Sequence, residues 1–116
     1  MATWTGSWRN QYGSVVTLTE EGGRLFGTLR TALRDSGFFG RDYDVVGTCH
    51  GECIAFAFAG PTPKGDMVCA FTGVLREGKM QTVWHVVSDK AAGADGKRAW
   101  PHAVMTNADT FERMQG

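Results

Sequence analysis

The residues best suited to chemistry lie near the start of the chain, where Asn10, Tyr12 and Ser14 follow one another at every second position of "TGSWRNQYGS". Side chains two positions apart on a strand point to the same face. These amide and hydroxyl groups can therefore meet on one side of a sheet and donate hydrogen bonds to a carbonyl oxygen. Asn and Ser also stabilise turns by bonding to nearby backbone groups. The segment indicates either a polar pocket or a solvated hairpin.

A planar urea-like ring, which carries two N–H groups besides its oxygen, also needs acceptors and flat apolar walls. Thr31 and Asp109 can accept hydrogen bonds from the N–H groups. Phe71 and Trp84 can enclose the ring between aromatic surfaces. Each residue also has an ordinary structural interpretation, since aromatic residues fill cores and a carboxylate can cap a strand or face solvent.

The elements that position these residues form an all-β pattern, because short alternating segments are separated by Gly- and Pro-containing turns. No segment of helical length has a clean 3.6-residue period. Eight evenly spaced strands predict a sandwich or an up-and-down barrel, and a barrel of eight strands can hold one small ligand. The predicted strands are Thr5–Asn10, Val15–Thr19, Arg24–Leu33, Tyr43–Cys49, Cys53–Gly60, Met67–Leu75, Lys79–Ser88 and Ala108–Met114.

The bulk composition predicts one domain over residues 1–116 and limits the possible partners. Twelve basic and twelve acidic residues give a formal net charge of zero, which argues against nucleic acid or an anionic membrane surface as the partner. No apolar run approaches the roughly 18 residues of a membrane span. No signal-peptide pattern follows Met1, so the sequence leaves open a cytoplasmic protein or a secreted one whose signal has been removed.

The three cysteines, Cys49, Cys53 and Cys69, fit a reducing compartment at least as well as a disulfide framework. A bridge between Cys49 and Cys53 across a hairpin remains open. The spacing of Cys49, His50 and Cys53 is unlike that of zinc sites, so no metal ligands are predicted. No set of nucleophile, base and orienting residue is visible, so no catalytic residues are predicted either.

Five segments in the same order resemble the avidin/streptavidin family. They are "TGSWRNQYGS", "LFGTLRTAL", "CAFTGVL", "TVWHVV" and "ADTF", and together they cover nearly the whole chain. The resemblance implies an eight-stranded antiparallel up-and-down barrel that binds biotin at its open end, usually as a dimer or tetramer. It implies a non-catalytic protein in which biotin is a bound ligand rather than a catalytic cofactor.

The resemblance also implies which positions contact the ligand. The polar contacts and ring walls named above match the family's motif, and Trp100 resembles the tryptophan that the family lends to a neighbouring subunit. The predicted ligand-binding residues are Asn10, Tyr12, Ser14, Leu29, Thr31, Leu33, Met67, Cys69, Phe71, Trp84, Val86, Trp100 and Asp109.

Several of these positions depart from the family pattern. Leu29 stands where the family has a tyrosine that donates to the ureido oxygen, and the phenol of Tyr12 either replaces that donor or lies at the rim. Met67 and Cys69 stand where the family has serine and threonine. A family tryptophan at the end of the fifth strand aligns with Gly60 or falls in the turn "GPTPKG", and Phe56 and Phe58 can fill its space from the same strand. These losses predict a reduced affinity for biotin.

Three other functions remain open on the sequence. One is binding of a different flat heterocycle, and another is an enzyme of natural-product metabolism that uses Asp109, His85 or Cys69. The third is a structural or interaction barrel whose mouth is filled by Leu29, Phe58 and Met67. His85 has the opposite parity to Trp84, so we expect it to point outwards together with Val83 and Val87. An outward apolar strip of this kind predicts a homo-oligomer.

Overall fold

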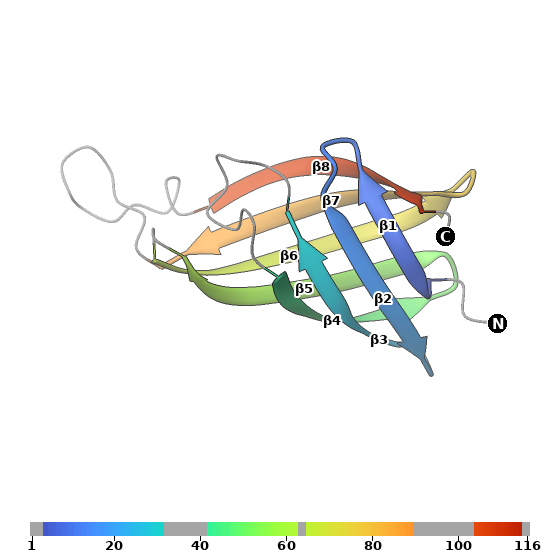
Figure 1. The fold of residues 1–116 in the computed structure, drawn as a ribbon, viewed down its shortest axis with the longest axis horizontal. Helices are drawn as coiled ribbons and strands as arrows, with labels where there is room; N and C mark the ends of the chain where they lie inside the picture. Colours follow the sequence, from blue (N-terminus) through green and yellow to red (C-terminus); the bar gives the residue numbers. More distant parts are fainter. Residues whose placement is uncertain (1–3, 32–41, 63–64, 90–103, 115–116) are drawn as a thin grey trace.

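The computed structural model describes residues 4–31, 42–62, 65–89 and 104–114. Each strand pairs antiparallel with its neighbours in sequence, and β8 pairs back with β1 to close the barrel (Figure 1). The described residues contain no helix long and apolar enough to cross a membrane. The predicted eight-stranded up-and-down barrel is confirmed. The strands are β1 (Gly6–Asn10), β2 (Val15–Glu21), β3 (Arg24–Arg30), β4 (Asp42–His50), β5 (Cys53–Thr62), β6 (Gly65–Arg76), β7 (Lys79–Ser88) and β8 (Val104–Arg113).

Most strand boundaries differ from the predicted ones by one or more residues. β5 continues through Pro61 to Thr62, β6 begins at Gly65, and β8 begins at Val104 rather than Ala108. The extra residues are held by ladder partners, such as Val87 opposite Val104. Backbone pairing satisfies N–H and C=O groups whatever the side chains are, so a strand can extend beyond its alternating pattern.

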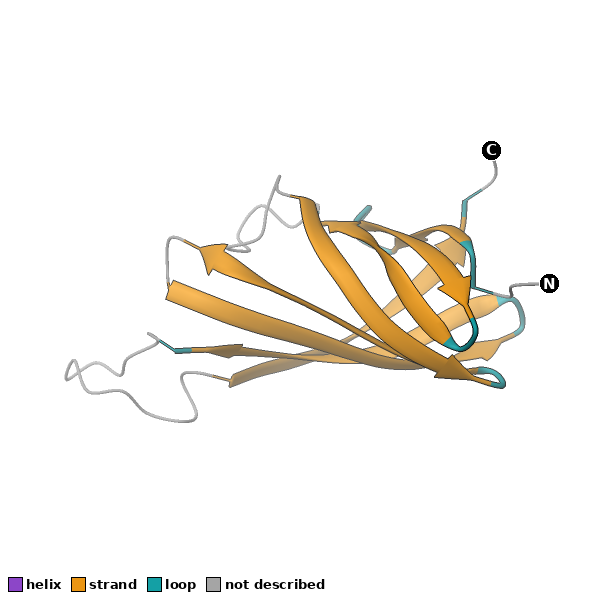
Figure 2. Cartoon of the chain, turned by 90° about the horizontal axis from the view of Figure 1, so that it is seen from below, coloured by secondary structure: helices purple, strands orange, loops and turns teal. Residues whose placement is uncertain are grey.

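One end of the barrel is closed by tryptophans. The turns after β2, β4 and β6 lie at the same end as both termini (Figures 1 and 2). There Trp4 and Trp8 are fully buried, and the Trp8 indole N–H donates to the Trp4 carbonyl oxygen at 3.0 Å. The Arg113 guanidinium lies 4.2 Å from the centre of the Trp8 ring. Since this end is filled, room for a ligand has to lie towards the opposite end.

Two inward-facing glycines allow neighbouring strands to approach closely. A Cβ at Gly27 would collide with the Thr17 carbonyl oxygen, and a Cβ at Gly47 would collide with the Ala55 carbonyl oxygen. Glycine within a strand commonly marks a bend or a close backbone approach. These two positions therefore let β2–β5 curve into the barrel.

We predict that Gly27→Ala lowers the free energy of unfolding by about 3 kcal/mol or more, because the added methyl group meets backbone rather than a movable side chain. The matched control is Thr28→Ala on the exposed side of the same strand, expected to change stability by about 0.5 kcal/mol or less. Urea denaturation measures both. Equal stability of Gly27→Ala and the parent would show that the strands do not approach as described.

Candidate ligand-binding site

The first turn of the chain is organised by the side chain of Asn10. The Asn10 Oδ1 atom accepts hydrogen bonds from the backbone N–H groups of Tyr12, at 3.0 Å, and Ser14, at 2.9 Å. Gly13 closes the turn with a backbone bond to Asn10 and a φ of 90°, a conformation suited to glycine. The interpretation that the Asn10 side chain stabilises a turn by bonding to nearby backbone groups is therefore confirmed.

The same amide group also reaches the last strand. Because Oδ1 is held by the turn, Nδ2 points away from it and donates to Asp109 Oδ2 at 3.1 Å. The neighbouring Gln11 adds a second link, since its Oε1 accepts from the Thr110 N–H at 3.0 Å. Asp109 is only 7% exposed, so its carboxylate is a buried acceptor at the point where β8 meets the first turn.

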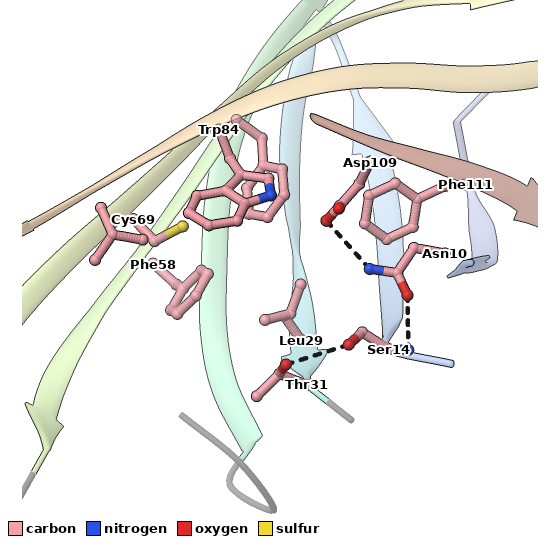
Figure 3. Close-up of a pocket in the computed structure, with 11 residues that line it drawn as sticks. Asn10, Ser14, Leu29, Thr31, Phe58, Cys69, Trp84, Asp109 and Phe111 are labelled. Atoms are coloured by element: carbon pink, nitrogen blue, oxygen red, sulfur yellow. Dashed lines mark hydrogen bonds between the residues drawn. The ribbon is translucent and has the colours of Figure 1, made fainter. Parts of the chain in front are cut away.

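Ser14 and Thr31 extend this polar group across β2 and β3. Both residues are buried, and their hydroxyl oxygens lie 3.2 Å apart in a hydrogen bond that either can donate. A hydroxyl group can serve as donor or acceptor. Together with Asn10 and Asp109, these residues place donors and acceptors on one wall of the barrel interior (Figure 3).

The opposite wall is aromatic and centres on Phe71. Its ring stacks on Phe56 with a centroid separation of 4.7 Å. Phe58, Trp84 and Phe111 surround it at 6.4, 6.5 and 6.1 Å. Such separations are typical of interacting aromatic pairs. The cluster provides a broad apolar surface that faces the polar wall.

A cavity of about 70 Å³ lies between the two walls. Its volume is below the roughly 300–1,000 Å³ typical of small-molecule pockets, so the described side chains enclose room for one small ring. Most of the predicted ligand-binding residues line it. The lining residues are Asn10, Ser14, Leu29, Thr31, Phe58, Cys69, Phe71, Trp84, Val86, Asp109 and Phe111.

Two predicted residues do not line this cavity. Tyr12 is 48% exposed, because it lies in the turn after β1, where the strand alternation that aligned it with Asn10 no longer holds. Met67 is half-buried and borders a separate surface depression beside Gly60. Leu33 and Trp100 lie outside the described residues.

Phe58 and Phe111 line the cavity although they were not predicted as ligand contacts. The signal for Phe111 was present in "ADTF", since it lies two residues after Asp109 and shares its face. The signal for Phe58 was the alternation in "CIAFAFAG". In the sequence, neither residue can be distinguished from an ordinary core aromatic. Only the closed barrel brings the two side chains together at the cavity.

Tyr43 occupies the space beside Gly60, one of the two places with which the sequence resemblance aligns a tryptophan. A Cβ at Gly60 would lie 2.6 Å from Cε1 of the Tyr43 ring. The same ring packs against Phe58 with centroids 5.1 Å apart. Tyr43 therefore packs closely onto the backbone of β5 at this position.

The cysteine thiols are free and differ in environment. Burial, with a smaller contribution from the charge of Asp109, raises the pKa of Cys69 to about 12. Cys49 faces inwards and is half-buried, and burial raises its pKa as well. Thiolates are the reactive form of cysteine, so Cys69 is a poor nucleophile.

Cys49 and Cys53 form no disulfide. Cys53 is exposed and pairs across the hairpin with His50 rather than with Cys49, so the two cysteine side chains lie on opposite faces of the sheet.

The fold and the cavity together define a class of protein, the closed eight-stranded antiparallel barrel with a cavity between a polar and an aromatic wall. The chain belongs to the Avidin family, whose family model matches residues 1–114. No curated protein sequence matches the chain. Among the described residues, no group of three or more His, Cys, Asp or Glu side chains could hold a metal ion.

Solved structures with the same fold include biotin complexes. The rhizavidin–biotin complex has a TM-score of 0.80 and 20% identity, with coverage of 100% of this chain and 97% of rhizavidin. The bradavidin2–biotin complex has a TM-score of 0.75 and 18% identity, with coverage of 95% and 96%. Apo shwanavidin has a TM-score of 0.77 and 19% identity, with coverage of 98% of each chain. At these identities the similarity shows the fold.

We predict that iodoacetamide at about pH 8 labels Cys53 rapidly and leaves Cys69 unlabelled in the folded protein. Because burial raises the pKa of Cys69 to about 12, its thiol stays protonated at that pH, and the side chain is also inaccessible to the reagent. Labelling in urea followed by peptide mass spectrometry is the control, since both thiols should then react. Rapid labelling of Cys69 in the folded protein would contradict the described cavity wall.

Proposed function

We propose that this protein binds biotin in the barrel cavity as a non-catalytic homo-oligomer. The observation that carries the proposal is that the buried polar wall of Asn10, Ser14, Thr31 and Asp109 faces the aromatic wall around Phe71. Membership of the Avidin family and the biotin complexes among the structural relatives support the choice of ligand.

The polar wall matches the hydrogen-bonding groups of a ureido ring. Ser14 Oγ and the second N–H of the Asn10 amide donate to the ureido oxygen. The Asp109 carboxylate and the Thr31 hydroxyl accept from the two ring N–H groups. The flat ring then lies against Phe71 and Trp84, where burial of apolar area adds to the hydrogen bonds.

Three departures lower the affinity for biotin relative to the family's tightest binders. Leu29 lines the cavity with an apolar side chain in place of a phenol donor, Cys69 replaces a hydroxyl, and Tyr43 packs over Gly60 where an indole wall would stand. Lost hydrogen bonds and unsatisfied partners of this kind remove about 4–7 kcal/mol in total, or about a thousandfold to a hundred-thousandfold in affinity.

A second candidate ligand is another flat heterocycle of the urea or lactam type. The observation in its favour is Leu29, which makes the cavity more apolar on the side where the ligand carbonyl would lie. An enzymatic role has less support, because burial holds Cys69 as a thiol and His85 is exposed on the outside of the barrel.

We predict that calorimetric titration detects biotin binding and that Asp109→Ala and Ser14→Ala each weaken it by about 1–3 kcal/mol, since each leaves a buried ligand group without its partner. Asp44→Ala, which removes an exposed carboxylate outside the barrel, is the matched control and should leave the affinity unchanged. Binding that is indifferent to both cavity substitutions would place the site elsewhere. Absence of biotin binding by the parent would favour the second ligand class.

We further predict that Leu29→Tyr binds biotin more tightly than Leu29→Phe, by about 1 kcal/mol or fivefold. The two variants share an aromatic ring and differ in the hydroxyl group, so the comparison isolates the donor from the change in volume. Titration of both variants measures the difference. Equal affinities would show that the position of Leu29 does not face the ureido oxygen.

A further inference from the structure

The cavity contains a buried carboxylate whose charge is not compensated by its neighbours. Asp109 is 7% exposed, and it is the single acidic or basic residue among the described residues that line the cavity. The Cys69 thiol stays neutral, because burial raises its pKa to about 12. In the described part of the chain Asp109 takes part in no ion pair, since those pairs lie between exposed side chains of other residues.

The groups that bond to the Asp109 carboxylate are uncharged amides, and they leave room for a ligand. Asn10 Nδ2 lies 3.1 Å from Asp109 Oδ2, and Gln11 Nε2 lies 3.5 Å from Asp109 Oδ1. Hydrogen bonds from a cation to a carboxylate are shorter, at about 2.7–2.9 Å. A carboxylate can also accept at about four lone-pair positions. Asp109 can therefore accept further and stronger hydrogen bonds from a cation inside the cavity.

An aliphatic side chain lies on the same wall as the polar groups. Leu29 is 3% exposed and lines the cavity. Figure 3 shows it beside the hydroxyl groups of Ser14 and Thr31. A carbonyl oxygen buried against an aliphatic side chain loses its hydrogen bonds to water without replacement. A ligand that presents an apolar atom to Leu29 avoids this loss.

The aromatic wall favours a flat ligand that carries a positive charge. The face of an aromatic ring has a negative electrostatic potential and attracts cations, most strongly in tryptophan. Trp84 lines the cavity beside Phe71, with ring centroids 6.5 Å apart. The rings that bind a flat neutral ligand by apolar contact therefore bind a flat cation more tightly.

We infer that the cavity selects a small planar cation of the cyclic amidinium type over a neutral cyclic urea of the same shape. Such a ring has two N–H donors and one delocalised positive charge, and the carbon between its nitrogens bears no oxygen. The N–H groups donate to Asp109 and Thr31, and this carbon faces Leu29. The ring faces lie against Phe71 and Trp84. The inference rests on the proposed function in using the same cavity, and it adds a ligand class.

The loss of ligand hydration is the main cost of binding a cation, and Asp109 offsets it. The carboxylate is already buried in the unliganded protein, so it loses little further hydration when a ligand enters. A neutral ring covers the same carboxylate and leaves its charge uncompensated, which is unfavourable. Planar delocalised cations are also more weakly hydrated than an ammonium group, so they enter a buried site more readily.

The experiment compares two rings of nearly equal shape by NMR titration of the isotope-labelled protein at neutral pH. Ethyleneurea is a neutral five-membered cyclic urea. Methylimidazoline is a cyclic amidine that is protonated at neutral pH, and its methyl group takes the place of the carbonyl oxygen. At about 0.15 M salt we expect methylimidazoline to bind about tenfold more tightly or better, with a shift of the Trp84 indole signal. Equal affinities, or tighter binding of the urea, would overturn the inference.

Asp109→Asn tests whether the charge of Asp109 causes the preference. The substitution removes the charge and keeps an acceptor oxygen for Asn10, so it should bring the ratio of the two affinities to about one. Asp44→Asn, which neutralises an exposed carboxylate, is the matched control and should keep the ratio of the parent. A preference that persists in Asp109→Asn would show that the cation is attracted elsewhere, and it would contradict the inference.

Leu29→Tyr gives a second test that leaves Asp109 in place. Compared with Leu29→Phe, it should bind ethyleneurea about fivefold more tightly, because the added hydroxyl donates to the urea oxygen, and it should bind methylimidazoline no more tightly. An equal gain for both rings would show that the carbon between the nitrogens does not face Leu29, contrary to the inference.

Biotin binding is measured separately, so the two proposals can fail independently. Biotin binding without a preference for methylimidazoline contradicts this inference alone. A preference for methylimidazoline without biotin binding supports the inference and contradicts biotin as the ligand. Absence of binding by both rings and by biotin contradicts both proposals.

Discussion

The hydrogen bonds of the Asn10 amide connect the first turn, the closure of the barrel and the cavity. Its oxygen is held by two backbone N–H groups of the turn, and this orientation directs its nitrogen to Asp109 on the last strand. A buried carboxylate needs such donors, because an unpaired buried charge is costly. The pairing of β1 with β8 brings the two residues together across almost the whole length of the chain. The polar wall of the cavity is thus a direct consequence of how the barrel closes.

The inner and outer surfaces of β6 and β7 have separate roles because successive side chains point to opposite faces. On β7, Trp84 lies at the cavity and His85 is exposed outside. On β6, Phe71 anchors the aromatic cluster, while Ala70 lies next to His85 on the outer face. The same two strands therefore support both the proposed ligand site and the outward apolar strip from which a homo-oligomer is predicted.

Much of the fold was predictable from the sequence, because turn residues separate segments whose alternation matches a half-buried strand. The same alternation placed Trp84 inside and His85 outside. It failed at Tyr12, which lies in a turn, and at the start of β8, where pairing with β7 rather than a side-chain pattern extends the strand. The alternation also could not decide whether Cys49 and Cys53 form a disulfide, because that depends on the register of the hairpin between β4 and β5. Phe58 and Phe111 became recognisable as cavity residues only once β5 and β8 were part of one closed barrel.

The central claim is that biotin occupies the cavity between Asp109 and Trp84. The most direct measurement is a titration of isotope-labelled protein with biotin, followed by the NMR signals of the side-chain N–H groups. The account predicts that the Asn10 amide and the Trp84 indole signals shift, while the Trp8 indole, which donates to Trp4 at the closed end, stays unchanged. Shifts at Trp8 with none at Asn10 or Trp84 would contradict the account.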